Sequence, residues 1–190
     1  YLRKLTIMKN ILFTLALLVS FNSFGQAELE YEERLKGLDK TAYEKYQAGD
    51  YISAAADYKK ITEQYDSKFE SDYQFFIATA WFYSGLIKLN LESGCASAII
   101  DFNKSIKLYP SNVAAYNSRA TAHLCMDNFQ GAINDCEAAI KLDPLFTDAF
   151  DQMIFAKAML NLDYCSDYKT AKEQGLKLND DRLVDFENCN

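Results

Sequence analysis

An internal repeat constrains the fold of this 190-residue chain more than any other feature of its sequence. Four two-residue segments that begin with aspartate are spaced at intervals of 44, 34 and 32 residues. The pairs are Asp57-Tyr58, Asp101-Phe102, Asp135-Cys136 and Asp167-Tyr168. Pro110 and Pro144 are also 34 residues apart, and each follows an Ile-Lys-Leu sequence by one residue. A period of this length predicts an array of similar units, each burying its apolar face against its neighbours.

Each unit has the apolar pattern of two helices joined by a turn. In residues 112–143, one helical stripe runs through Tyr116, Ala120 and His123, and a turn at residues 127–128 separates it from a second stripe. The second stripe consists of Phe129, Ala132, Cys136, Ala139 and Ile140. Because alanine is small, Ala120, Ala132 and Ala139 allow the two helix backbones to approach closely. The chain has only 7 Gly and 2 Pro, and this scarcity of helix breakers also favours a helical protein.

Residues 113–144 resemble a tetratricopeptide repeat. The residues that match its aromatic, small and proline positions are Tyr116, Ala120, His123, Phe129, Ala132, Cys136, Ala139 and Pro144. Related patterns run through Gly49, Tyr51, Ala54, Tyr58 and Ile61, then through Trp81, Gly85, Ala98, Phe102 and Pro110, and in degenerate form through Phe150, Tyr168 and Ala171. The resemblance implies an all-α fold, an α-solenoid of about four helical hairpins with a C-terminal capping helix.

The expected repeats occupy about residues 35–66, 67–110, 111–144 and 145–175, with the cap at 176–190, and together they form one domain over 26–190. About ten extra residues near Ser67–Phe76 are expected to lengthen the next helix, from about Glu70 to Leu91. This helix is apolar nearly all round, which favours burial within the array over a membrane span. Gly175 is expected to end the last repeat helix, and a cap over Asp180–Glu187 is expected to contact it through Leu183 and Phe186.

The N-terminal region has the plan of a secretory signal peptide. Lys9 precedes an apolar run over 11–19, and small residues follow up to Gly25. We expect cleavage after Gly25 and a periplasmic or secreted protein; residues 1–7 precede Met8 and are interpreted as lying upstream of the start. The competing interpretation, a membrane anchor, is disfavoured because the run is too short to span a bilayer. Removing residues 1–25 takes three basic residues and no acid, so the net charge falls from −7 to −10. Nucleic acid and anionic lipid are therefore disfavoured as partners.

Five cysteines remain after that cleavage, and an oxidising compartment would favour bridges between them. Cys165 begins the last repeat helix and Cys189 ends the expected cap, so a bridge between them, which would hold the cap in place, is the first hypothesis for a disulfide. Cys95 and Cys125 are a second hypothesis, since both are expected near the turns of adjacent units. Cys136 occupies a core position and is expected to stay outside both bridges.

The sequence offers no assembled set of catalytic residues. His123, the one histidine, falls on a packed stripe and is expected to be a core residue. The aspartates of the repeated pairs are expected to be exposed on the outer face of the second helices. With no CxxC motif and no glycine-rich phosphate loop, we predict no enzyme activity, no metal and no cofactor.

The family resemblance places partner-binding residues on the first helix of each unit. Those residues are Asp39, Tyr43 and Tyr46; Tyr83, Ile87 and Asn90; Asn117 and Thr121; and Asp151 and Phe155. They lack the Lys, Asn and Arg pattern by which some members of the family hold a C-terminal carboxylate. The leading hypothesis is a binding scaffold, a monomer or weak homo-oligomer that docks a protein or peptide in its concave groove. The alternative is a structural module that associates with itself.

Overall fold

The structure, a computed structural model, describes residues 26, 28–63, 70–91, 94–179 and 189. Every regular element in these ranges is helical. The expected signal peptide at 1–25 and most of the expected cap, including Leu183 and Phe186, lie outside the described residues.

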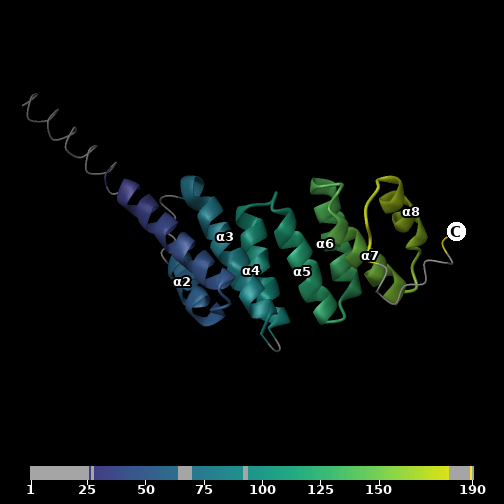
Figure 1. Ribbon diagram of the computed structural model, residues 1–190, viewed down its shortest axis with the longest axis horizontal. Helices are drawn as coiled ribbons and strands as arrows, with labels where there is room; N and C mark the ends of the chain where they lie inside the picture. Colours follow the sequence, from purple (N-terminus) through teal and green to yellow (C-terminus); the bar gives the residue numbers. More distant parts are fainter. Residues whose placement is uncertain (1–25, 27, 64–69, 92–93, 180–188, 190) are drawn as a thin grey trace, which may run out of the picture.

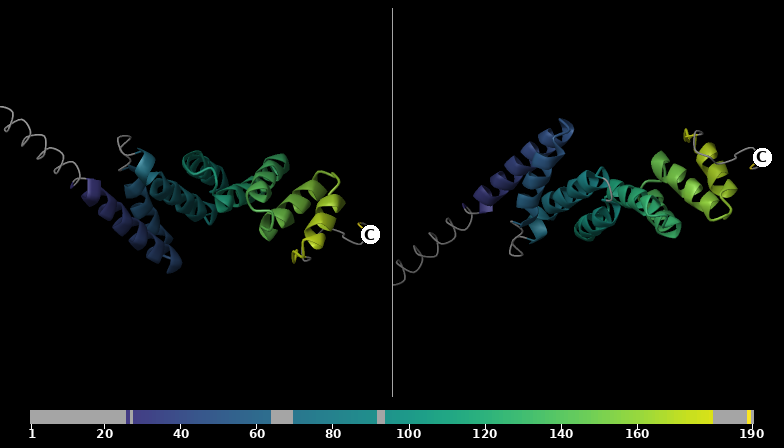
Figure 2. Two further views of the ribbon diagram at one scale, coloured as in Figure 1. Left: turned by 90° about the horizontal axis from the view of Figure 1, so that it is seen from above. Right: turned by 90° about the horizontal axis from the view of Figure 1, so that it is seen from below.

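The helices pair into hairpins that follow one another along the long axis of the molecule (Figure 1). The N-terminal helix (28–47) pairs with α2 (Tyr51–Glu63), and α3 (Glu70–Leu89) pairs with α4 (Cys95–Leu108). The next hairpins are α5 (Val113–Cys125) with α6 (Phe129–Leu142), and α7 (Thr147–Met159) with α8 (Cys165–Glu173). Successive hairpins rotate relative to one another, as the two views of Figure 2 show. The predicted all-α solenoid is confirmed.

The turns within and after the hairpins use residues with positive φ. Gly49, Asp127 and Asn161 have φ values of 78°, 54° and 54°, and they occupy the turns of the first, third and fourth hairpins. Asn128 is the N-cap residue of α6, and its side chain accepts a hydrogen bond from the backbone amide of Gly131, which satisfies one free donor of the first turn. Gly175, with φ of 76°, follows the last repeat helix.

The core is built from small residues on one helix facing large ones on another. Ala54, Ala98 and Ala132 hold the same place in successive second helices, and each is completely buried. The large residues four positions later in two of these helices, Tyr58 and Phe102, are also completely buried. Burying a side chain of that size stabilises the fold by roughly 1.5–3 kcal/mol, so the repeated small and large positions supply much of the packing energy.

The long helix expected over about Glu70–Leu91 ends at Leu89 and lies inside the array, in contact with α2, α4 and α5. Its apolar character is used for packing on several sides. Among the described residues, no helix combines the length and hydropathy needed to cross a bilayer.

Candidate functional site

The first helices of the hairpins form a continuous inner layer. Helix α3 contacts α5, and α5 contacts α7, whereas no second helix contacts another second helix within the described ranges. The first helices are therefore closer together than the second helices, which makes their shared face the concave side. Side chains on this face that are not used in packing are the candidates for binding.

At the N-terminal end of this face the structure brings several tyrosines together. Tyr43 is 42% exposed, and its ring meets the ring of Tyr83 edge-on at 5.5 Å between centroids. Tyr46 also packs against Tyr83, at 5.1 Å. Tyr58 of α2 stacks against the ring of Tyr83, with 5.2 Å between ring centroids and 7° between ring planes. Asp39, four residues before Tyr43 on the same helix, is half-buried beside them.

In the second hairpin the structure buries one of the predicted groove residues. Ile87 is only 3% exposed and belongs to the core around Tyr58, so it is not available to a partner. Residues that directly follow the first aromatic position, as Asn117 follows Tyr116, are those on the concave face. The equivalent residues of α3 are Phe82 and Leu86, which are partly buried.

Trp81 and Gly85 hold the positions of Tyr116 and Ala120, and by that spacing Phe82 and Leu86 correspond to Asn117 and Thr121. Tyr83, one position further on, lies mainly between helices, and Asn90 at the end of α3 is exposed and donates from its side chain to the Leu86 carbonyl at 3.0 Å.

The third and fourth hairpins meet through amide side chains. Nε2 of Gln152 donates to Oδ1 of Asn117 at 3.0 Å, and the Thr121 hydroxyl donates to Oε1 of Gln152 at 3.3 Å. Gln152 is 6% exposed, so these bonds satisfy a buried amide. Asn117 and Thr121 therefore lie on the predicted face, but they also tie α5 to α7. Phe155 is half-buried and packs against Phe129 at 6.4 Å between ring centroids.

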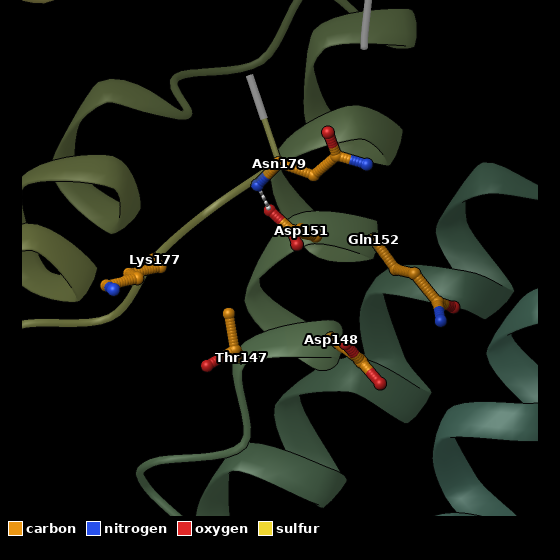
Figure 3. A pocket seen from close by; sticks show the side chains of 6 residues that line it. All are labelled: Thr147, Asp148, Asp151, Gln152, Lys177 and Asn179. Carbon is orange, nitrogen blue, oxygen red and sulfur yellow. Dashed lines mark hydrogen bonds between the residues drawn. The ribbon is translucent and has the colours of Figure 1, made fainter. Parts of the chain in front are cut away.

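A cavity of about 430 Å³ opens beside α7. Thr147, Asp148, Asp151 and Gln152 line it from α7, and Lys177 and Asn179 line it from the segment that follows α8 (Figure 3). Oδ1 of Asp151 accepts a hydrogen bond from the backbone amide of Asn179 at 2.9 Å, which fastens that segment to the helix. Two carboxylates and one lysine give the cavity an acidic, polar lining.

The aspartates of the repeated pairs are not exposed, contrary to the sequence-based expectation. Asp57, Asp101 and Asp135 are 4%, 2% and 5% exposed, and Asp167 is half-buried. Each forms an ion pair with a basic residue on the first helix of its own hairpin. The pairs are Lys45–Asp57 at 2.5 Å, Lys88–Asp101 at 2.5 Å, Arg119–Asp135 at 2.5 Å and Lys157–Asp167 at 2.6 Å.

These ion pairs close each hairpin and form no catalytic series. Hydrogen bonds from Lys45 and Lys60 hold the pKa of Asp57 below its ordinary value of 3.8. A buried carboxylate without such a partner would cost several kcal/mol, so the cation explains how an aspartate is accommodated there. The four aspartates recur because the helix pairing recurs.

His123 occupies a position at which the other three hairpins have a lysine. It follows Tyr116 by seven residues, as Lys88 follows Trp81 and Lys157 follows Phe150. Its Nε2 is 3.8 Å from Oδ2 of Asp135, while Arg119, one turn earlier, makes the two-point contact with that carboxylate. Burial lowers the pKa of His123 below 6.5, against the opposing effect of Asp135. The ring is thus a half-buried packing residue of the α5–α6 pair. The described residues contain no group of three or more His, Cys, Asp or Glu side chains placed to hold a metal ion.

The structure joins the same two cysteine pairs that the sequence suggests. Cys95 at the start of α4 is bridged to Cys125 at the end of α5, with 6.3 Å between Cα atoms. Cys165 at the start of α8 is bridged to Cys189, with 5.0 Å between Cα atoms. Cys136 is completely buried in α6, outside both bridges.

Comparisons with known proteins agree with this geometry, although no family model matches the chain. The small glutamine-rich tetratricopeptide repeat-containing protein 2 of Saccharomyces cerevisiae is 35% identical over 60 residues, covering 32% of this chain and 17% of that protein. The first TPR of Spaghetti (RPAP3) bound to HSP90 peptide SRMEEVD superposes with a TM-score of 0.57 at 20% identity, over 67% of this chain and 93% of that one. The chain folds as a tetratricopeptide-repeat array. The crystal structure of MamA has the same repeat fold, with a TM-score of 0.64 at 20% identity over 74% of this chain and 78% of that one.

This tetratricopeptide-repeat array spans 17% or less of the length of the curated relatives it matches. The likeness to solved structures therefore describes the fold. The binding residues must be argued from this chain's own side chains.

Proposed function

We propose that this protein is a non-catalytic scaffold that binds a segment of a partner protein along the face of its first helices. The observation that carries the proposal is the continuous layer in which α3 contacts α5 and α5 contacts α7. Such a layer offers a long, preformed surface, and preformed rigidity limits the entropy lost on binding. The peptide in the Spaghetti complex supports this, because a similar fold there carries a bound peptide.

The chemistry of the face changes along its length. The exposed ring of Tyr43 lies at the N-terminal end, and the partly buried Phe82 and Leu86 follow on α3. At α7 the lining is polar, with Asp148 and Asp151 in a cavity of about 430 Å³, large enough for one or two side chains. We infer a partner segment that places aromatic or apolar groups near α3 and keeps carboxylates away from α7.

A photo-crosslinking experiment tests the face. A photoreactive residue at Tyr43 or Asp148, on first helices, should capture one and the same partner from an envelope extract. The matched controls are Ala56 on α2 and Glu137 on α6, which are exposed on second helices and should capture little. Capture mainly from the second helices, or capture of a second copy of this chain, would replace the proposal with the self-associating alternative.

We also propose that the protein is exported to the periplasm or secreted. The apolar run over 11–19 after Lys9 supports this, and so do the two disulfides, which persist in oxidising compartments. Mass analysis of protein from its native host should find Gln26 at the N-terminus. A cytoplasmic form that retains Met8 would contradict the location.

A further inference from the structure

Asp39 is an acid in an aromatic surrounding. The rings of Tyr43, Tyr46 and Tyr58 all contact Tyr83, so four tyrosines from three helices form one cluster. The pKa of Tyr83 is raised to about 12; burial is the largest cause, and the negative charges of the neighbouring Tyr43 and Asp39 add to it. Burial and then the charge of Asp39 also raise the pKa of Tyr58. The carboxylate therefore lies within electrostatic reach of the cluster.

Two buried polar atoms in this cluster have no hydrogen-bond partner. They are Oδ1 of Asp39 and the hydroxyl oxygen of Tyr58, a residue that is completely buried. Burial raises the pKa of Asp39, as expected for a carboxylate that loses water without gaining a compensating donor. Unsatisfied buried polar atoms are uncommon in native proteins, so both oxygens have unused capacity to accept a hydrogen bond.

Asp39 differs from the repeated aspartates in its charge environment. In the described part of the chain, Asp57, Asp101, Asp135 and Asp167 each have a lysine or arginine, whereas Asp39 makes no ion pair. It occupies the place on its helix that Asn117 and Asp151 occupy on theirs, so it belongs to the concave face. The residue as a whole is half-buried.

We propose that the Asp39–tyrosine cluster binds a lysine or arginine side chain of the docked partner segment. This inference rests on the proposed function and names the partner's chemistry at one end of the face. The carboxylate supplies the opposite charge, and the exposed ring of Tyr43 supplies an aromatic face that attracts a cation. The chain's net charge of −7 favours the approach of a basic segment.

The test uses the whole chain with ¹³C-labelled tyrosine rings and NMR. The probes are N-acetyl-lysine methylamide and its norleucine counterpart, whose side chain has the same four carbons and lacks the ammonium group. At constant ionic strength, the lysine probe should shift the Tyr43 and Tyr83 signals saturably, and the norleucine probe should not. Asp39→Asn should weaken binding of the lysine probe by about tenfold, because it removes the charge–charge contact and leaves the aromatic contact in place.

Glu44→Gln is the matched control, because it removes one acid from the exposed side of the same helix. It should change binding by less than about twofold, as exposed charges are largely screened. The Asp39→Asn variant should melt at or above the wild-type temperature, since it removes an uncompensated charge. The comparison of the two probes on wild-type protein does not depend on how that variant folds.

Equal shifts from both probes, or unchanged lysine binding in Asp39→Asn, would overturn the inference. Tighter binding of tetramethylammonium than of the lysine probe would overturn the assignment to a peptide side chain. A crosslinked partner whose affinity is insensitive to Asp39→Asn would refute this inference while leaving the binding face of the proposed function standing.

Discussion

Replacing Gly85 with alanine should destabilise the protein, although the same change at Gly37 should stabilise it. Gly85 lies on α3, and an added Cβ would come within 2.6–2.9 Å of three ring atoms of Phe102. The Phe102 ring is completely buried and contacts Phe82, so it has no room to swing aside. Gly37 lies in the N-terminal helix, and an added Cβ there would meet no atom within 4 Å.

The two substitutions share one favourable effect and differ in one unfavourable effect. Alanine is better than glycine inside a helix by about 1 kcal/mol, and this gain applies at both positions. Overpacking a core costs roughly 1–3 kcal/mol, and this cost applies only at Gly85. The expected net change in unfolding free energy is therefore a gain of about 1 kcal/mol for Gly37→Ala and a loss of up to about 2 kcal/mol for Gly85→Ala.

Thermal melts followed by circular dichroism measure both effects. A domain of this size shifts by about 2–4 °C per kcal/mol, so the two variants should differ by several degrees. Phe102→Leu should be less costly in the Gly85→Ala background than alone, with a coupling of about 1 kcal/mol. A Gly85→Ala variant that melts as high as Gly37→Ala would refute the close approach of α3 and α4.

Three further predictions concern packing, disulfides and pH. Ala132→Leu should cost roughly 1–3 kcal/mol because Ala132 is completely buried, whereas Gln130→Leu at an exposed position should stay within about 0.5 kcal/mol; equal melting temperatures would contradict the helix register. Unreduced peptide mapping should recover the Cys165–Cys189 bridge, and its removal should cost about 3 kcal/mol in denaturant unfolding. Burial lowers the pKa of His123 in the folded protein, so the neutral ring contributes fully to the free energy of unfolding above pH 6.5, and this contribution is lost as the pH falls through the pKa of the folded protein. In His123→Gln the urea midpoint should therefore depend less on pH below pH 6.5.

The hairpin architecture was predictable because its signals are local. Alanines such as Ala98 and Ala132 recur with the period of the array, and only a small residue fits where two helix backbones meet. The turns are similarly local, since Gly49 and Asp127 occupy positive-φ positions that glycine, aspartate and asparagine tolerate best. Such features depend on neighbours close in the sequence.

The burial of the repeated aspartates was not predictable from their own helix. An acid on a second helix is usually exposed, and the residue that compensates Asp135 lies 16 positions earlier on the first helix. The signal was present in the spacing of Lys88 and Lys157, which follow Trp81 and Phe150 by the same seven residues. This signal is visible only when the basic positions of the first helix are compared with the acidic positions of the second helix. The third repeat interrupts it, because His123 occupies the position where the other repeats have a lysine.

The ion pairs connect helices within a hairpin, whereas the Cys95–Cys125 bridge connects two successive hairpins. Each ion pair joins the two helices of one hairpin, whereas the bridge joins α4 of the second hairpin to α5 of the third. In an array whose units contact only their neighbours, unfolding can start at an end and proceed one unit at a time. The bridge prevents the second and third hairpins from separating, so fraying from either end should stop at this pair. Cooperative unfolding of the centre would then depend on the redox state of its surroundings.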